Sequence, residues 1–369
     1  MNSHSKENPP KTAILLLNMG GPETEEEVHP YLKELFQDKE LLKLPVQKIL
    51  GNFIAWRRTP FIQKRYEELG QYSPTRKIME EQGRLIALQL DRICPETAPH
   101  ECVPGFRYAQ PRTGEELNRL SNAEKIILFS HYPQHSCSTS GSSLCDAYRT
   151  LKKHPELKEK ISVIDQWWDR QDYTLLWAKL IESKFKTFKE SHDLKDEDIL
   201  ILYSAHSLPE AYCLEKGDRY NLEIEGSVRN IEMKLNSMGL RHQHSLGWQS
   251  KVGPKRTKWL SPSTPEVIEQ TKQKAILIVP IAFTTDHIET LDEIDIEFRE
   301  YVEEAGKYFG RVDCFNLDES FIDLCSKLVS EHMDNEFRSS IRPCCINCVG
   351  KDCEAMRKFF SSEPVHYNS

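Results

Sequence analysis

The sequence predicts an α/β protein of two domains, each with a four-stranded parallel sheet flanked by helices. Eight short apolar runs of strand length alternate with longer stretches of helical periodicity over most of the chain. These runs are apolar on both faces, as in parallel sheets that helices cover on both sides. At 369 residues the chain also exceeds what one hydrophobic core usually supports. Eight strands fit two four-stranded domains better than one continuous sheet.

The expected elements follow one another from residue 12 to residue 334. Strands are expected at 12–19, 102–109, 125–131, 161–165, 199–205, 245–251, 275–283 and 311–316. Helical periodicity is clearest at 76–93, 142–153, 171–190, 219–238 and 319–334. The join is expected near 131–143, a stretch rich in Ser and turn formers. The domains are therefore expected at 12–133 and 134–330, with a disordered tail at 1–11 and a cysteine-rich C-terminal extension at 331–369.

Composition and charge exclude several classes of function. The net charge of −8 argues against nucleic acid as the main partner, because a phosphate binder needs an excess of Lys and Arg. No apolar run approaches the roughly 20 residues that span a bilayer. The amino terminus has no apolar stretch, lacks Arg and contains Glu7, so we expect neither a signal peptide nor an organelle transit peptide.

Cysteine usage points to one unusual stretch. The chain has 11 cysteines, an odd number for a disulfide framework, and seven of them are scattered singly. The other four lie in the stretch 344–353, CCINCVGKDC. Cys345 and Cys348 form a C-x₂-C pair and Cys353 follows, whereas Cys344 would point elsewhere if its neighbour is a ligand. Three good ligands are one fewer than a structural zinc site needs, so zinc, an iron–sulfur cluster, disulfides and free thiols all stay open here.

Residues 41–66 differ in character from the rest of the chain. They mix apolar and aromatic residues with six Lys and Arg residues. One interpretation is an amphipathic helical hairpin that packs on its own domain. The other is an apolar lip with a basic rim that meets a membrane surface or an apolar anionic ligand.

Ligands of parallel α/β sheets bind at the carboxyl ends of the strands, and several polar loops are expected there. NMGGPET follows the first strand but lacks the dinucleotide-binding spacing G-x-G-x-x-G. The sequence therefore argues against a nicotinamide cofactor. SAHSLPE places His206 at the end of another strand. GFRYAQP and GWQSKVGP add Arg107, Tyr108 and Trp248. A His, aromatic side chains and a cation at one edge suit a flat apolar ligand with anionic groups.

The loop after 275–283 carries an acidic stripe. If a helix begins near Asp286, Glu289, Glu293 and Glu297 recur at every fourth residue. Like charges at that spacing each cost a helix roughly 0.2–0.5 kcal/mol, and the helix dipole explains only those in the first turn. A solvated acidic face is one interpretation. We favour a path for protons or cations, because a stripe directly behind an apolar strand is expected to be buried.

Together, these motifs resemble the ferrochelatase family from about Lys11 to Phe360. The resemblance is carried by NMGGPET, RRTP, GFRYAQP, SCSTSGSSL, SAHSLP, WQSKVGP and IAFTTDHIETLDEIDIEF, in the family's order. It implies two Rossmann-type domains with a porphyrin cleft between them, and the insertion of Fe²⁺ into protoporphyrin IX with release of two protons, the last step of haem synthesis. Two alternatives are a chelatase that inserts Co²⁺ or Ni²⁺ into another tetrapyrrole and a non-catalytic porphyrin-binding iron–sulfur sensor.

The resemblance also implies roles for individual residues. His206 matches the proton-accepting His, and His287 with Glu289 matches the facing pair, while Asp286, Glu293 and Glu297 match the acidic path of protons or metal. The positions that match the porphyrin site are Met19, Leu32, Arg58, Tyr66, Ser73, Arg107, Tyr132 and Trp248. Residues 41–66 match a lip that dips into the membrane.

The cysteine tail gains its fourth ligand only through the resemblance. Animal-type members hold a [2Fe–2S] cluster on a C-x₂-C-x₄-C stretch and one central cysteine, here Cys345, Cys348, Cys353 and Cys137. Zinc at the same thiolates is the alternative. Members of this type are homodimers on the matrix side of the mitochondrial inner membrane, and the resemblance implies the same here.

Some family positions differ in this chain. Residues 168–172 read WDRQD where animal relatives carry His, His135 replaces a usual Tyr, and Lys327 falls where some members have a carboxylate. No role is carried over to these positions.

Overall fold

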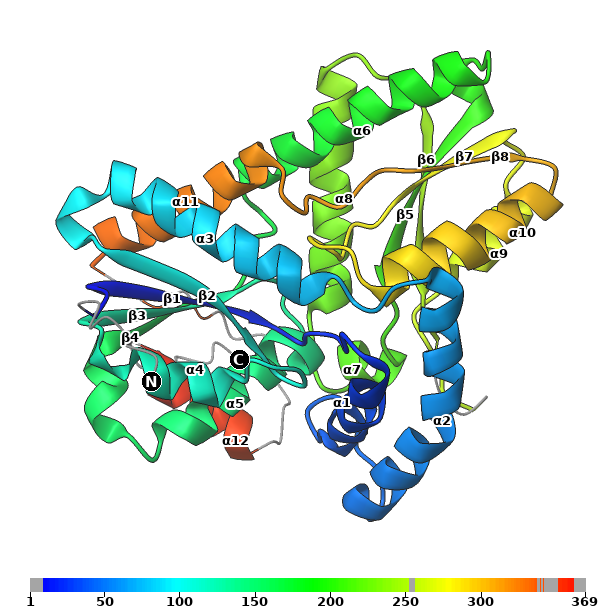
Figure 1. Ribbon diagram of the computed structural model, residues 1–369. Helices are drawn as coiled ribbons and strands as arrows, with labels where there is room; N and C mark the ends of the chain where they lie inside the picture. The colour runs from blue at the N-terminus through cyan, green and yellow to red at the C-terminus, as the bar shows by residue number, and fades with distance from the viewer. Residues whose placement is uncertain (1–8, 252–255, 337–338, 340, 342–350, 362–369) are drawn as a thin grey trace.

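The structure is a computed structural model that describes residues 9–251, 256–336, 339, 341 and 351–361. In this part of the chain the strands form two parallel four-stranded sheets, as the sequence predicts (Figure 1). The first sheet has the order β2-β1-β3-β4 and the second has the order β6-β5-β7-β8. The strands are β1 (Thr12–Asn18), β2 (His100–Phe106), β3 (Lys125–Ser130), β4 (Ile161–Ile164), β5 (Ile199–His206), β6 (Gln243–Gln249), β7 (Ala275–Val279) and β8 (Tyr308–Arg311).

Helices cover both faces of the first sheet. Along β1 the side chains alternate: Ile14 and Leu16 face one apolar core, whereas Ala13, Leu15 and Leu17 face another. Helices α3 (Thr75–Ile93) and α11 (Glu319–Asp334) cover the first of these faces. The helices on the opposite face are α4 (Thr113–Arg119), α5 (Ser142–Leu151) and α12 (Lys351–Phe360).

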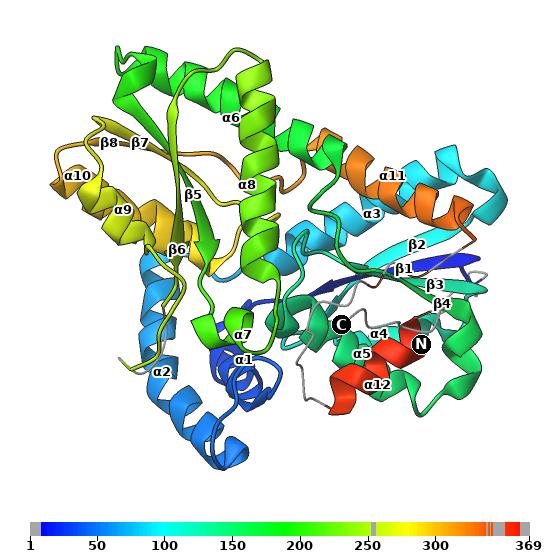
Figure 2. The same ribbon diagram turned by 180° about the vertical axis from the view of Figure 1, so that it is seen from behind.

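The second sheet follows the same rule. On β5, Ile201 and Tyr203 pack against α6 (Gln171–Ser191) and α8 (Tyr220–Ser237). Leu200 and Leu202 face α9 (Thr264–Gln270), α10 (Arg299–Glu304) and the helical turn before α10. Figure 2 shows α8 running alongside β5 in the view from behind. Because both faces are covered, the carboxyl edge of the sheet is the part left for polar side chains.

The boundary expected at residue 133 lies too early in the chain. β4 pairs in parallel with β3, with Leu128 opposite Val163, so the first sheet continues past the predicted join. The chain also returns to the first sheet at α11, which packs against α3 (Figure 1). One apolar core contains residues of both sheets, such as Ile14 and Ile201. The Ser-rich stretch is thus a loop and a helix start inside the first domain, and turn composition alone does not mark a domain boundary.

Residues 41–66 do not form a helical hairpin by themselves. A loop leads into one 23-residue helix, α2 (Gln47–Leu69), which packs against α1 (Glu25–Gln37). Leu32 and Tyr66 lie in the small apolar core between these two helices. The outer side of α2 exposes large apolar side chains at Val46, Ile49, Phe53, Trp56 and Phe61. Among the described helices, none has the length and apolar character required to cross a membrane.

Two further elements differ from the prediction. The last strand is β8, at Tyr308–Arg311, where 311–316 was expected. The acidic helix expected to begin near Asp286 is a π-helix, η6 (Glu289–Phe298), that continues into α10. Sequence periodicity does not distinguish an α-helix from a π-helix, which occurs mostly as short segments at functional sites.

Candidate functional site

The carboxyl ends of β5 and β6 bring the predicted residues of the second sheet together. In the parallel register, His206 lies opposite Gln249, and Ala205 lies opposite Trp248. Trp248 is buried, with its ring centroid 6.1 Å from that of Tyr220. It therefore supports the edge of the site from within the core instead of standing free as an aromatic plate.

His206 is the basic group that stands free at this edge. Within the described residues its imidazole has no hydrogen bond or ion pair, although it lies close enough to Glu289 and His287 for their charges to act on it. Burial lowers the pKa of His206, and the Glu289 carboxylate offsets part of that effect. The ring is therefore neutral near pH 7 and has a free nitrogen that can accept a proton.

His287 and Glu289 form a close pair beside His206. His287 Nδ1 lies 2.8 Å from Glu289 Oε2, and the backbone N–H of Glu289 donates to the same nitrogen over 3.1 Å. Burial acts to raise the pKa of Glu289, but the charge and hydrogen bond of His287 hold it at about 2. His287 Nδ1 therefore lies within hydrogen-bonding distance of both a backbone donor and a carboxylate oxygen.

The acidic stripe of η6 is half-buried, and its carboxylates have different partners. Glu293 accepts hydrogen bonds from the backbone N–H of Ser250 at 2.7 Å and from Gln249 Nε2 at 3.0 Å, as well as from the Ser250 hydroxyl. Burial, opposed by these bonds, raises the pKa of Glu293 to about 6. Glu297 lies 3.0 Å from Arg65 Nη2. The pKa of Glu293 is thereby brought close to neutral pH.

Asp286 has another environment than the stripe. Its carboxylate forms an ion pair with Arg311 at 3.0 Å and accepts hydrogen bonds from Asn316 and Thr290 at 2.6 and 2.9 Å. Burial opposes the effect, but Arg311 and these bonds lower the pKa of Asp286. The contacts hold the loop before η6 in place.

Arg65, on α2, joins the lip helix to η6. Its guanidinium lies 2.6 Å from Asp292 Oδ2 in addition to its contact with Glu297. Asp292 is buried, so this ion pair ties the position of α2 to that of the acidic helix. Sequence reasoning assigned Arg65 only to a basic rim, because its partners lie more than two hundred residues away.

Tyrosines from the first domain surround Glu289. Burial and, to a smaller extent, the Glu289 carboxylate raise the pKa of Tyr31 and Tyr66. The same two effects raise the pKa of Tyr132. The Tyr132 hydroxyl accepts a hydrogen bond of 2.8 Å from the backbone N–H of Met19. Tyr31 was missed, although it directly precedes the predicted Leu32. Tyrosines from α1, from α2 and from the loop after β3 therefore lie close enough to Glu289 for its charge to act on them.

The predicted anion-binding residues lie in different environments. Within the described residues Arg58 has no carboxylate partner, and its guanidinium carbon lies 6.0 Å from the centroid of the Phe36 ring. Burial and the neighbouring Arg65 lower the pKa of Arg58. Ser73, in contrast, is buried and its hydroxyl donates to Thr75 Oγ1 at 2.9 Å. Arg58 is therefore the cation that is free to receive an anionic group.

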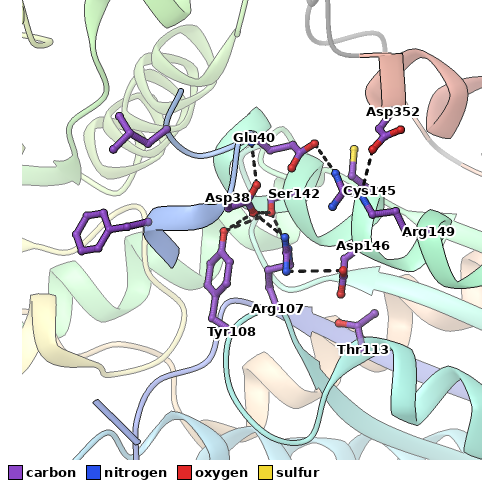
Figure 3. A network of polar contacts seen from close by, with 12 residues as sticks. Asp38, Glu40, Arg107, Tyr108, Thr113, Ser142, Cys145, Asp146, Arg149 and Asp352 are labelled. Atoms are coloured by element: carbon purple, nitrogen blue, oxygen red, sulfur yellow. Dashed lines mark hydrogen bonds and ion pairs between the residues drawn. The ribbon is translucent and has the colours of Figure 1, made fainter. Parts of the chain in front are cut away.

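Arg107 belongs to a buried polar network (Figure 3). Its guanidinium pairs with Asp38 at 3.0 Å, and Asp38 also accepts hydrogen bonds from Tyr108 at 2.6 Å and from Ser142. Arg107 is therefore bound to a protein carboxylate instead of being open to a ligand. That Arg107 lines the porphyrin site stays a prediction, and in this structure Asp38 already neutralises its charge.

The same network extends to the C-terminal helix. Arg149 on α5 lies 2.5 Å from Glu40 and 3.1 Å from Asp352, so it joins the loop before α2 to α12 (Figure 3). Glu40 is in turn linked to Asp38 by its backbone N–H, at 2.8 Å. The position of α12 is thereby fixed relative to the start of the lip.

Two of the four predicted cluster cysteines lie in the described part of the chain. Cys137 and Cys353, far apart in sequence, line one small pocket together with Asp165 and Met356. Cys345 and Cys348 lie outside the described residues. Cys353 Sγ also lies 3.6 Å from Cys145 Sγ, a thiol to which the sequence gave no role. Cys137 is disulfide-bonded in this structure, and the pocket brings sulfur atoms together from two distant segments of the chain.

The positions that depart from the family have local structural partners. Arg170 and Lys327 pair with Asp172 at 2.6 and 3.1 Å. His135 is buried with Nδ1 at 2.8 Å from Asp165 Oδ1. These contacts connect α6 with α11 and β4 with the loop after β3.

Comparison with known proteins identifies relatives of the chain. A family model described as Ferrochelatase matches residues 11–333. "Ferrochelatase, mitochondrial" of Dictyostelium discoideum is 42% identical over 348 residues, which cover 88% of this chain and 81% of that protein. The Drosophila melanogaster protein of the same name is 40% identical, with 95% and 92% covered. Among solved structures, SirB from Bacillus subtilis with Fe³⁺ gives a TM-score of 0.47 at 10% identity, covering 89% of this chain and 98% of that one.

Proposed function

The chain belongs to the ferrochelatase family, and from this premise we propose that His206, His287 and Glu289 are its catalytic residues. The enzyme is a metal chelatase that inserts Fe²⁺ into protoporphyrin in haem synthesis. The observation that carries the assignment of residues is the free imidazole of His206 beside the His287–Glu289 pair.

Metal insertion demands that two pyrrole nitrogens lose their protons. His206 is suited to accept the first proton, because burial keeps its ring neutral. The Glu289 carboxylate remains ionised near neutral pH and stabilises the imidazolium that forms. His287 Nδ1, which meets both the carboxylate and a backbone N–H, can pass a proton onward.

The acidic stripe supplies the exit for these protons. Glu293, with its pKa of about 6, can bind and release a proton close to neutral pH. Glu297 continues the stripe toward Arg65 and the lip. Imidazole nitrogens and carboxylate oxygens, the groups that bind these protons, are also ligands of Fe²⁺. The stripe is therefore also a route by which the metal substrate arrives. Asp286 contributes by holding the loop before η6 through Arg311.

Porphyrin binding combines apolar contact with recognition of its carboxylates. Arg58 is suited to a propionate, since charge-assisted Arg–carboxylate bonds are strong and Arg58 lacks a protein carboxylate among the described residues. Tyr66 and Tyr132 contribute aromatic surface next to Glu289. The remaining predicted contacts are Met19, Leu32, Ser73, Arg107 and Trp248.

The exposed apolar side of α2 suits contact with a membrane, from which an insoluble porphyrin enters. Phe53, Trp56 and Phe61 are all more than half exposed, and Lys and Arg residues alternate with them. Sedimentation with anionic lipid vesicles tests this contact, and replacement of Trp56 and Phe53 by Gln is expected to leave the protein in the supernatant. Together with the names of the relatives, this surface supports a location at a mitochondrial membrane. Assembly as a homodimer is proposed from the family resemblance alone.

A [2Fe–2S] cluster is proposed at Cys137, Cys345, Cys348 and Cys353. Four thiolates are the usual ligands of such a cluster, which supplies a redox-active, oxygen-sensitive link when bound. Support comes from the pocket that Cys137 and Cys353 share. Replacement of Cys137 by Ser is expected to abolish the visible absorption of the cluster. It should also lower the measured iron content by about two atoms per chain. Replacement of the neighbouring Cys145 by Ser is the matched control and should leave both unchanged.

The catalytic assignment is tested by following porphyrin absorbance in anaerobic protein with Fe²⁺ or Zn²⁺ and protoporphyrin. Replacement of His206 by Ala is expected to lower turnover by about 10²–10⁴-fold, the range of a general base. His154, an exposed histidine paired with one carboxylate, is the control to replace by Ala. Full activity of the His206 variant would refute the assignment of the base without questioning the family.

A further inference from the structure

We propose that Glu232, His242 and His244 form a second metal site, which binds one divalent ion of the Zn²⁺ class. The three side chains lie at the amino end of β6, whereas His206 and Glu289 lie at the carboxyl edge of the same sheet. The site is separate from the ferrochelatase reaction. Its support is the convergence of two imidazoles on one buried carboxylate.

The donor atoms already lie as close together as metal ligands do. His242 Nε2 is 2.9 Å from Glu232 Oε2, and His244 Nδ1 is 3.1 Å from the same oxygen. One donor atom from each residue falls within a 4.8 Å group. Tetrahedral zinc with nitrogen and oxygen ligands at about 2.0–2.1 Å needs donors roughly 3.3 Å apart. The two carboxylate–imidazole distances therefore lie within a few tenths of an ångström of this spacing, and the two imidazole nitrogens lie within 4.8 Å of each other.

Local backbone geometry explains why both histidines reach the carboxylate. His242 and His244 are separated by one residue at the start of β6, so their side chains leave the extended chain on the same face. Glu232 projects toward them from the last turns of α8. Phe185 packs near the His242 ring, with centroids 6.1 Å apart, and fixes its orientation.

The charge of Glu232 requires compensation. Its side chain is only 7% exposed, and its partners among the described residues are the Tyr203 hydroxyl, at 2.7 Å, and the two histidines. Imidazole is a countercharge only when protonated, whereas a divalent cation neutralises the carboxylate and uses the free electron pairs of both rings. Tyr203 would then hold the second carboxylate oxygen, as outer-shell partners of metal ligands do.

One side of the proposed site is open to solvent. The His244 side chain is 46% exposed, whereas that of His242 is 1% exposed. Three protein ligands with an exposed fourth position suit a zinc ion that keeps one water or a second protein's ligand. Gln249 lies five positions beyond His244 on β6, about 16 Å along a strand, so an ion here does not touch the proposed catalytic groups.

The proposal is tested by titrating the intact protein with Zn²⁺ in competition with a chromophoric chelator. The wild type is expected to take up one equivalent more than His244→Ala, and its Tm should rise more with Zn²⁺. His244→Cys should restore the equivalent, since thiolate is a zinc ligand. His154→Ala is the matched control, because His154 pairs with a single carboxylate, at 3.2 Å from Glu156.

Chelatase activity of His244→Ala should equal that of the wild type, which separates this proposal from the catalytic assignment. Because His244 is half exposed, its replacement should leave the fold intact, and an unchanged Tm without Zn²⁺ verifies this. Equal Zn²⁺ uptake by the wild type and His244→Ala would overturn the proposal. So would failure of His244→Cys to bind the additional ion.

Discussion

The second sheet carries two clusters of His and Glu residues at its opposite ends, and they differ in how fully their polar atoms are used. At the carboxyl edge, Glu289 pairs with His287, while His206 has no polar partner among the described residues. At the amino end, Glu232 is bound by Tyr203 and two histidines. The same residue types therefore build an incomplete cluster and a saturated one.

Exposure follows the same division. The side chain of Glu289 is 34% exposed, and tyrosines of another domain surround it, whereas the side chain of Glu232 is 7% exposed and packed inside one domain. A cluster that must exchange protons and accept a substrate needs unoccupied atoms. A cluster that retains an ion needs its ligands held in place beforehand. The incomplete cluster at the carboxyl edge therefore suits proton exchange, and the saturated cluster at the amino end suits the retention of an ion.

Replacement of Glu289 by Gln tests the incomplete cluster most strongly. We expect turnover to fall by about 100-fold, because the neutral amide neither stabilises protonated His206 nor pairs with protonated His287. The loss should appear in kcat at saturating porphyrin. Glu300, exposed on α10, is the matched position for the same replacement and should keep full activity. Loss of activity through KM alone would contradict a role in proton transfer.

Replacement of Glu293 by Gln should have a smaller effect that depends on pH. Burial raises the pKa of Glu293 to about 6, so the carboxylate is protonated below that pH and accepts protons only above it. Wild-type activity is therefore expected to rise with pH through about 6. The variant should lose roughly 10-fold at pH 8 and much less at pH 5. An identical pH profile in both proteins would remove Glu293 from the path.

Much of this comparison could be predicted from the sequence, because it depends on strand ends. Apolar runs located seven of the eight strands and missed the bounds of the last, and parallel sheets place His206 and the acidic stripe at one edge. Partners distant in sequence could not be predicted. Arg65 reaches Asp292 and Arg107 reaches Asp38 only through the packing of α1 and α2. Hydrophobic patterns report which face is buried, but not which charges meet.

The amino-end cluster shows the same limit. The spacing of His242 and His244 is visible in the sequence, but their carboxylate partner lies on the preceding helix. The π-helix was also beyond prediction, since Glu289, Glu293 and Glu297 have a spacing that suits an α-helix equally well. Local patterns thus find the candidate residues, and tertiary packing decides which of them are free to react.

Replacement of Tyr203 by Phe gives the smallest expected effect and tests the saturated cluster. The change removes the 2.7 Å hydrogen bond that the Tyr203 hydroxyl donates to Glu232 Oε1. Affinity for Zn²⁺ should fall about 10-fold, as outer-shell partners of metal ligands contribute 10–100-fold, and the free energy of unfolding should fall by about 1 kcal/mol. Chelatase activity should not change.

Tyr173 is the matched control for this replacement. It is a buried tyrosine whose hydroxyl bonds Gln134 at 3.3 Å and the carbonyl of Ile281 at 3.4 Å, away from Glu232. Tyr173→Phe should cost similar stability and leave Zn²⁺ affinity unchanged. If both variants bind Zn²⁺ equally, the Tyr203 hydroxyl does not orient a metal ligand. The amino-end cluster would then be an ordinary buried hydrogen-bond network, and the contrast between the two ends of the sheet would lose its functional meaning.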